Sequence, residues 1–341
     1  MNLRIETAKK LNKTSFYHVL KEPLIAFIEG PDAERYLHGR ITQNVKTLKK
    51  DSGAHSLVLT PQGKVQGTFT IYKLENKFLV VSDSLSSETR AEELVSSIMQ
   101  FKVADRLTLT SIKDTHLLVS VQGAEAGKLL ESIFKISLPE PPLALIALEV
   151  SREEVFITNH NRGTAKGFDI VLSQKVFLET LKPGLSNCIE DKTGEVLKLF
   201  RIASLTPAID SDITEKTIAT EINTTPYVSF NKGCYAGQEV VEMSTARGRP
   251  NRMLIGFYVE NIGEALGVES SITTEDGTPC GQITSESFLL DNKLSFALGF
   301  IKTTQADATS LFVKGIQIKR IHAEGENGTS SLEALIKKAS L

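Results

Sequence analysis

The apolar patterning of the 341-residue sequence changes at Arg249-Pro250, and this change limits the folds open to the chain. Before it, strand-like runs alternate with amphipathic segments. After it, short apolar runs such as RMLIGFYV and FALGFI follow one another, separated by turns that contain Gly and Asp. Strands mixed with helices predict α+β layers, and strands alone predict a barrel or sandwich. We predict an α+β region over 1–248, a β-barrel over 249–322, and a linker and short helix over 323–341.

Within the α+β region, apolar residues recur at helical or strand spacing. One helix is predicted after Pro31, and another carries Leu94, Val95, Ile98 and Met99 on one face. The other predicted elements are strands near 23–30, 56–60, 65–74, 78–83, 117–121, 145–150 and 154–158 and helices near 124–134, 173–181 and 194–203. We predict that this region forms two intertwined α+β lobes.

The composition argues against several classes of protein. A net charge of -2 provides no global field to attract nucleic acid or an anionic membrane, so we expect neither as a direct partner. The three cysteines, Cys188, Cys234 and Cys280, are too widely spaced for a C-x-x-C metal site and odd in number, which favours a reducing compartment. The polar start MNLRIETAKKLNKT has no apolar signal core, and no apolar run reaches the ~20 residues of a membrane span. We expect a cytoplasmic protein.

The stretch NKGCYAGQEV singles out Cys234 as a candidate reactive thiol. Thiolates are stabilised by nearby cations and by free backbone N–H groups, and Lys232 and the turn after the cysteine offer both. Gly233 and Gly237 would let backbone or ligand come close. The alternative is that Cys234 is a small buried apolar residue in a turn. A Cys–His pair could arise only through the fold, because no histidine is near in sequence: they stand at His18, His38, His55, His116, His160 and His322.

The longer stretch YVSFNKGCYAGQEVV resembles the signature of the YgfZ family, folate-binding iron–sulfur maturation factors related to the T-protein of the glycine cleavage system. Three further stretches are similar to family blocks in the same order: GPDAERYLHGRITQNV, GAHSLVLTPQGKVQGTFTIYKL and GTPCGQITSESFLLDNKLSFALGFI. The resemblance implies a three-lobed α+β fold around a central, folate-sized channel, with a C-terminal β-barrel. It also implies a role in maturing or repairing iron–sulfur enzymes, some of which modify tRNA.

The hairpin block departs from the T-protein pattern, which has two acidic residues near the reactive nitrogens of the folate. Here these positions are Gly67 and Thr68, and neither can act as a carboxylate base. Lys64 stands where the YgfZ family usually has arginine, which keeps the positive charge but loses the bidentate fork. A solvated lysine in a hairpin turn is the alternative. Whether the chain catalyses a reaction is left open, and the departure weighs against a transferase.

A second departure lies in FRIASLTPAID, which resembles the R-x-E-x-G-x-P block of the relatives. Arg201 and Pro207 match, but Ala203 replaces the glutamate that holds the pterin and Leu205 replaces the glycine. The resemblance therefore implies weak or unusual folate binding. Glu221 is a candidate replacement carboxylate, although an exposed glutamate is the commoner case.

The resemblance assigns catalytic roles to Cys234 and Lys232 and folate contacts to a further set of residues. These are Lys64, Arg201, Glu221, Tyr235, Gln238, Glu239 and Arg247. Arg247 belongs to the basic stretch ARGRPNR, which could meet a glutamate tail or a phosphate, or form an exposed turn between domains. No resident metal is expected, although Cys234 could bind iron transiently.

The segment NHNRGTAKGFDIVL is weakly similar to a glycine-rich loop of the T-protein. Arg162, Gly163 and Phe168 keep the skeleton of that loop. We interpret it as a structural turn ahead of a strand and assign no role to His160.

Three functions compete. We favour a tetrahydrofolate-dependent accessory factor that serves iron–sulfur client or assembly proteins, supports tRNA modification indirectly, and uses Cys234 as a redox-active thiol or transient iron ligand. The first alternative is a tetrahydrofolate-dependent aminomethyl or one-carbon transferase. The second is a factor that binds tRNA directly, which would need a basic surface.

Overall fold

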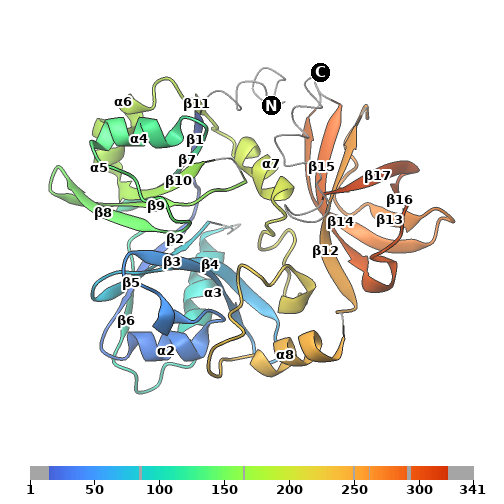
Figure 1. The fold of residues 1–341 in the computed structure, drawn as a ribbon, viewed down its shortest axis with the longest axis horizontal. Helices are drawn as coiled ribbons and strands as arrows, with labels where there is room; N and C mark the ends of the chain where they lie inside the picture. The colour runs from blue at the N-terminus through green and yellow to red at the C-terminus, as the bar shows by residue number, and fades with distance from the viewer. Residues whose placement is uncertain are drawn as a thin grey trace.

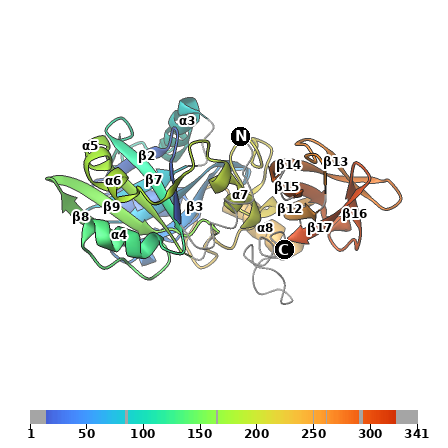
Figure 2. The ribbon, with the colours of Figure 1, turned by 90° about the horizontal axis from the view of Figure 1, so that it is seen from above.

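The computed structural model describes residues 15–83, 87–163, 166–248, 250–260, 262–289 and 293–321. The linker and helix predicted over 323–341 lie outside these residues. Two α+β lobes form one end of the molecule and a β-barrel forms the other, with helix α7 (Glu195–Ala203) between them, as Figures 1 and 2 show.

The first lobe is a five-stranded antiparallel sheet with helices on its outer face. The strand order is β3-β4-β5-β2-β6, with bounds Ser52–Leu59, Val65–Lys73, Lys77–Ser82, Leu24–Glu29 and Thr108–Ser111. Helices α2 (Ala33–Arg40) and α3 (Glu88–Met99) bury Leu37 and Leu94 against this face. The 3-10 turn η1 (Val45–Thr47) follows α2.

The second lobe is a six-stranded sheet of order β11-β1-β7-β10-β9-β8. The strands span Ile189–Glu190, Ser15–Val19, His116–Gly123, Gly167–Ser173, Glu153–Asn159 and Leu145–Val150. Its outer face carries α4 (Ala126–Phe134) and a helical run of α5 (Gln174–Val176), η2 (Phe177–Leu181) and α6 (Lys182–Gly184). Strand β1 precedes the first lobe in sequence, but it pairs with β7 in the sheet of the second lobe. The chain therefore passes from the second lobe to the first and back, and the two lobes are intertwined.

The inner faces of the two sheets pack on each other. Side chains alternate across a strand, so β2 turns Leu24 to the helices and Ile25 to the second lobe. Ile25 and Tyr72 share one buried cluster with Phe156 and Val171. This cluster fixes the two sheets relative to each other.

The C-terminal strands close into a barrel of order β12-β15-β14-β13-β16-β17. Their bounds are Arg252–Glu260, Leu294–Lys302, Pro279–Leu289, Ser271–Thr274, Leu311–Val313 and Ile316–Ile321, and η5 (Thr303–Gln305) follows β15. Closure leaves no open sheet edge. The predicted fold class, α+β with a C-terminal β-barrel, is confirmed. No helix in the described part of the chain is long and apolar enough to cross a membrane.

Helix α7 joins the lobes to the barrel. Its apolar face buries Leu199, Ile202 and Ala203 against Phe296 and Leu298 of the barrel. After α7 the chain passes through η3 (Ala219–Glu221) to α8 (Gln238–Arg247) and then enters β12.

Candidate functional site

A cavity of about 540 Å³ lies where the two lobes meet α7 and the segment that follows it. Its volume is in the range of pockets that hold drug-sized ligands. The wall combines polar, charged and aromatic side chains from several elements. These are His18, Leu20, Lys21, His55, Thr68, Phe69, Thr70, Asp83, His160, Asn161, Arg162, Gly194, Leu197, Lys198, Arg201, Ser204, Thr206, Ala208, Ile209, Ser211, Pro226 and Tyr227.

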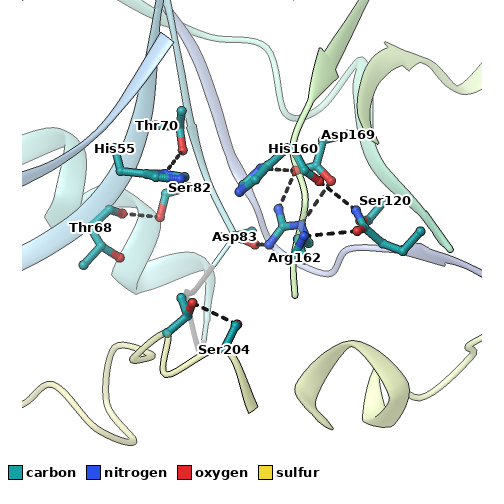
Figure 3. A network of polar contacts seen from close by, with 12 residues as sticks. His55, Thr68, Thr70, Ser82, Asp83, Ser120, His160, Arg162, Asp169 and Ser204 are labelled. Carbon is teal, nitrogen blue, oxygen red and sulfur yellow. Dashed lines mark hydrogen bonds and ion pairs between the residues drawn. The ribbon is translucent and has the colours of Figure 1, made fainter. Parts of the chain in front are cut away.

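Arg162 ties the two lobes together at this cavity. Its guanidinium donates to both carboxylate oxygens of Asp169 on β10, at 3.0 and 2.5 Å, and to Asp83, which follows β5 (Figure 3). Burial acts to raise the pKa of Asp83 and Asp169, but the charge and hydrogen bonds of their neighbours, Arg162 above all, outweigh it and hold both below the usual range. Both carboxylates are therefore ionised at neutral pH.

Two histidine rings lie side by side on the same wall. The ring centroids of His55 and His160 are 5.1 Å apart, and His160 Nδ1 lies 2.7 Å from Asp169 Oδ2 (Figure 3). An ionised carboxylate only accepts, so Nδ1 of His160 carries the proton of this bond. Burial, together with His160 and Arg162, lowers the pKa of His55 to about 3 and keeps it neutral. The sequence pattern predicts no role for His160, but the structure places it at the site.

Arg201 is the predicted folate contact that lines the cavity. Its guanidinium donates within the protein: Nη1 donates to Asp212 Oδ2 at 2.7 Å and to the Thr206 carbonyl at 2.8 Å, and Nη2 donates to Ser285 Oγ at 2.9 Å. Arg201 therefore holds the segment after α7 against the barrel. Ala203 is buried against barrel side chains, so the residue at this position faces the barrel rather than the cavity.

Lys232 anchors the cysteine loop to the end of α2. Its ammonium donates to the carbonyls of His38, Ile41 and Gln43 at 2.6, 2.6 and 2.8 Å. The last carbonyls of a helix lack partners within it and carry partial negative charge, which suits a cation. Burial lowers the pKa of Lys232 to about 7. The sequence predicted that Lys232 would stabilise the thiolate, but the structure directs its three donors to backbone carbonyls.

Backbone contacts complete this anchoring. Ser229 and Ala236 donate their N–H groups to the carbonyls of Thr42 and Gly39, at 3.1 and 3.3 Å. Gly237 has φ +86°, and a Cβ there would lie 2.6 Å from the Thr60 carbonyl oxygen, so only glycine fits this crossing.

Cys234 is exposed on this anchored loop. From the motif NKGCYAGQEV we predict a thiol that solvent reaches through the central cavity, and this prediction is wrong: Cys234 is exposed but is absent from the residues that line that cavity. The other two cysteines differ. Cys280 is buried and donates to the Ile272 carbonyl, Cys188 is half-buried, and burial raises the pKa of both.

The remaining predicted folate contacts lie away from the cavity. Lys64 is exposed at the β3–β4 turn and lines a separate cleft of about 590 Å³ beside α3. Tyr235 is buried in the core beneath the cysteine loop. Gln238 accepts from the Tyr235 N–H at 3.3 Å, Glu239 is exposed, and Arg247 ends α8. Sequence proximity to the motif thus does not place these residues at one site.

Glu221 pairs with the barrel rather than facing the cavity. Its two carboxylate oxygens accept from Arg252 Nε and Nη2 at 2.9 and 3.0 Å, and Oε2 also accepts from the Ile218 N–H. The Glu221 side chain is 10% exposed. Its predicted role as a replacement ligand carboxylate is therefore corrected to a contact between the lobes and the barrel.

Glu221→Gln is expected to lower the free energy of unfolding by about 1–3 kcal/mol, because one charged hydrogen bond to Arg252 is lost. The affinity for any ligand of the central cavity should not change. Urea denaturation and ligand titration measure the two quantities. The control is Glu260→Gln, whose exposed pair with Lys319 should matter less. A large loss of ligand affinity in Glu221→Gln would contradict the structural role.

Comparison with known families shows which family the chain belongs to. The family described as the GCVT N-terminal domain matches residues 25–232, more than half of the chain. The chain belongs to the GCVT family. The match spans most of both lobes, most of the cavity wall and the cysteine loop as far as Lys232.

Individual relatives agree with this assignment to the GCVT family. An aminomethyltransferase of Natranaerobius thermophilus is 26% identical over 290 residues, 81% of this chain and 75% of that protein. A tRNA-modifying protein YgfZ of Shigella sonnei is 24% identical over 240 residues, 67% of this chain and 68% of that protein. The resemblance to YgfZ and the T-protein is confirmed.

A solved structure agrees with the fold. The glycine cleavage system aminomethyltransferase T from Bartonella henselae superposes with a TM-score of 0.81, covering 94% of this chain and 88% of that one, at 16% identity. The T-protein-like fold is therefore shown for this member of the GCVT family.

The two hairpin positions that depart from the T-protein pattern face different sides of β4. A Cβ at Gly67 would lie 2.5 Å from Leu94 of α3, so this position points into the helix layer. Thr68 lines the cavity. Only the change at 68 alters the chemistry of the cavity wall in this GCVT protein. Across the described residues, no three His, Cys, Asp or Glu side chains are grouped to hold a metal ion.

Proposed function

We propose that the protein binds a tetrahydrofolate in the central cavity and acts, through Cys234, as an accessory factor in the maturation or repair of iron–sulfur proteins. Support for tRNA modification would then be indirect, through client enzymes. The observation that carries the proposal is the separation of two features. One is a cavity lined by polar, charged and aromatic side chains, and the other is an exposed thiol on a loop that Lys232 and backbone hydrogen bonds anchor to the end of α2.

The cavity wall fits the chemistry of a folate. The rings of His55 and Tyr227, 5.9 Å apart, offer aromatic faces for a planar heterocycle. Lys21 and Lys198 line the same cavity and suit the carboxylates of a glutamate tail. When bound, a tetrahydrofolate would supply a carrier for one-carbon groups.

The loop geometry suits a thiol that meets other proteins. Lys232 and the backbone contacts fix the loop, so Cys234 is presented at the surface without needing to unfold. Thiolate is the usual protein ligand for iron in clusters. A client or assembly protein could therefore exchange iron or electrons with Cys234 at this surface.

A one-carbon transferase is the second candidate. The aminomethyltransferase relative favours it, and Asp83 places a carboxylate in the cavity wall, with Asp169 bound to the same arginine, Arg162. However, Arg162 binds both carboxylates, and the threonine at 68 cannot accept a proton as a carboxylate does. Direct tRNA binding is less favoured because the net charge is -2.

Lys198→Glu is expected to weaken binding of 5-formyltetrahydrofolate at least tenfold, because it reverses a charge in the cavity wall. Titration calorimetry measures the affinity. Lys192→Glu is the matched control, since Lys192 is 73% exposed and outside the cavity lining. Failure of the wild-type protein to bind the ligand would refute the folate site, and equal losses in both variants would place the ligand elsewhere.

A further inference from the structure

Several hydroxyl groups line the central cavity, and most of them are hydrogen-bonded within the protein or exposed. These are Thr70, which bonds to His55 at 2.9 Å, Ser204 and Thr206, which bond to each other at 3.2 Å, and the exposed Ser211. The hydroxyls of Thr68 and Tyr227 make no hydrogen bond in the described part of the chain, although the two residues are only 6% and 7% exposed. A buried hydroxyl without a partner costs free energy in the empty protein, so each is a candidate contact for a ligand.

The Tyr227 hydroxyl opens on the cavity. Within the described part of the chain, the buried side-chain atoms that have neither a hydrogen-bond partner nor contact with solvent are Ser15 Oγ, His38 Nδ1 and Asn44 Oδ1. The hydroxyl oxygen of Tyr227 is not one of them, so solvent reaches it. Because Tyr227 is otherwise buried and lines the cavity, that solvent is in the cavity. A ligand in the cavity can therefore contact the hydroxyl directly.

The charges next to the phenol determine which kind of ligand atom it favours. Burial raises the pKa of Tyr227, and the charge of Asp83 adds to this effect, while that of Arg201 opposes it. The phenol is therefore protonated at neutral pH and can donate a hydrogen bond. Because the negative charge has the larger effect of the two, an anionic ligand group beside the phenol is disfavoured. A neutral acceptor, such as a carbonyl oxygen, is favoured.

Other contacts fix the position of Tyr227 without using its hydroxyl. The centroid of its ring lies 5.9 Å from that of His55, and the side chain packs in one buried cluster with Leu57. The backbone carbonyl of Tyr227 accepts from Thr42 Oγ1 at 2.6 Å. The hydroxyl is thus held in place before a ligand arrives, which lowers the entropy cost of binding. The fold itself does not depend on this oxygen.

We propose that the Tyr227 hydroxyl donates a hydrogen bond to a neutral carbonyl oxygen of the ligand in the central cavity. This inference rests on the proposed folate site, and in a tetrahydrofolate the ring carbonyl of the pteridine is an acceptor of this kind. Lys21 and Lys198, which line the same cavity, meet the carboxylates of the ligand. The two ends of the ligand are therefore recognised by different chemistry, and Tyr227 recognises the heterocycle.

Removal of the hydroxyl has different consequences for the free and the ligand-bound protein. In the free protein, Tyr227→Phe removes a polar group that has no protein partner, which does not weaken the fold. In the complex, it leaves the ligand carbonyl without a donor in a site from which the ligand has displaced water. We expect the affinity to fall about tenfold, which corresponds to a hydrogen bond of about 1.4 kcal/mol.

The test combines titration calorimetry of 5-formyltetrahydrofolate with urea denaturation in the absence of ligand, on the wild-type protein, Tyr227→Phe and Tyr36→Phe. Tyr36 is the matched control, because it is also 7% exposed but lies in the core of the first lobe, where its hydroxyl donates to the Ile98 carbonyl at 2.8 Å. Tyr227→Phe should bind about tenfold more weakly and unfold at the same urea concentration as the wild-type protein or at a higher one. Tyr36→Phe should keep the wild-type affinity and unfold at a lower urea concentration.

Infrared spectra of the bound ligand, labelled with carbon-13 at the ring carbonyl, test the identity of the acceptor. A hydrogen bond to a carbonyl lowers its stretching frequency. The labelled band should therefore lie at lower frequency in the wild-type complex than in the Tyr227→Phe complex.

The outcomes separate this inference from the proposed folate site. Equal affinity in the wild-type protein and Tyr227→Phe, or the same labelled band in both complexes, would overturn the role of Tyr227 and leave the folate site standing. A Tyr227→Phe protein that does not fold, or that loses as much stability as Tyr36→Phe, would show that the hydroxyl is structural. A wild-type protein that does not bind the ligand would overturn both proposals.

Discussion

Arg162→Met is expected to lower the free energy of unfolding by about 3–5 kcal/mol, because breaking a buried ion pair leaves an uncompensated buried charge. The Arg162 side chain is 13% exposed and that of Asp169 is 4% exposed. The guanidinium also bridges to Asp83, so its removal weakens the contact between the two lobes. Guanidinium chloride denaturation measures the change.

The matched control for this prediction is Arg106→Met. Arg106 also pairs with an aspartate, Asp32 at 3.2 Å, but its side chain is 76% exposed, and exposed ion pairs contribute little. A loss in Arg162→Met no greater than in Arg106→Met would show that the buried network does not stabilise the fold.

At acid pH, the difference in the free energy of unfolding between the wild-type protein and Arg162→Met should become smaller. The pKa values of Asp83 and Asp169 are lower in the folded protein than the value of about 3.9 expected after unfolding. Their contribution to stability is therefore present at neutral pH and is lost as the pH falls below about 4. In the variant the carboxyl groups gain protons more readily, which relieves the unpaired charge. A difference that stays constant from pH 7 to below pH 4 would contradict this account.

Local patterns in the sequence predict the fold well. The alternation of apolar residues in β2 and the helical spacing in α3 depend on each segment alone, and both elements form where the pattern places them. The change of pattern at Arg249-Pro250 likewise precedes the first barrel strand. The YgfZ resemblance adds the arrangement of these elements around a cavity, which no local pattern contains.

The site could be predicted only in part, because it is assembled from distant segments. His55 is in β3, Asp83 follows β5 and His160 follows β9, and nothing in their local sequence connects them. One signal was present: β9 and β10 pair as a hairpin, with Asn159 opposite Phe168, which brings His160 close to Asp169. Reading that register from the sequence would have indicated a histidine–aspartate pair.

For Lys232, proximity in the sequence led to a wrong prediction, namely that its ammonium would stabilise the thiolate of Cys234. It stands two residues before Cys234, but its acceptors His38 and Gln43 are 194 and 189 residues away in the chain. Glu221 is similar, since its partner Arg252 belongs to the barrel. A charged side chain near a motif pairs with backbone carbonyls or with an opposite charge that the fold brings close to it. These partners can be identified only from the structure.

Cys234→Ala is expected to abolish the function of the protein while changing its stability by no more than about 0.5 kcal/mol, the usual range for a surface substitution. The thiol is exposed, and the contacts that hold its loop come from Lys232 and the backbone. Cys234→Ser should fail as well, because a hydroxyl does not replace thiolate as a nucleophile or iron ligand. Cys188→Ala, which changes a half-buried thiol, is the control and should keep full function.

The most direct measurement is the activity of iron–sulfur enzymes, both radical-type and hydratase, in cells from which the gene has been deleted and which carry the wild-type gene, Cys234→Ala or Cys188→Ala. We predict that the wild-type and Cys188→Ala proteins restore these activities and that Cys234→Ala, present at the same level and with the same melting temperature, does not. Full restoration by Cys234→Ala, or normal iron–sulfur activities in the deletion strain itself, would contradict the account.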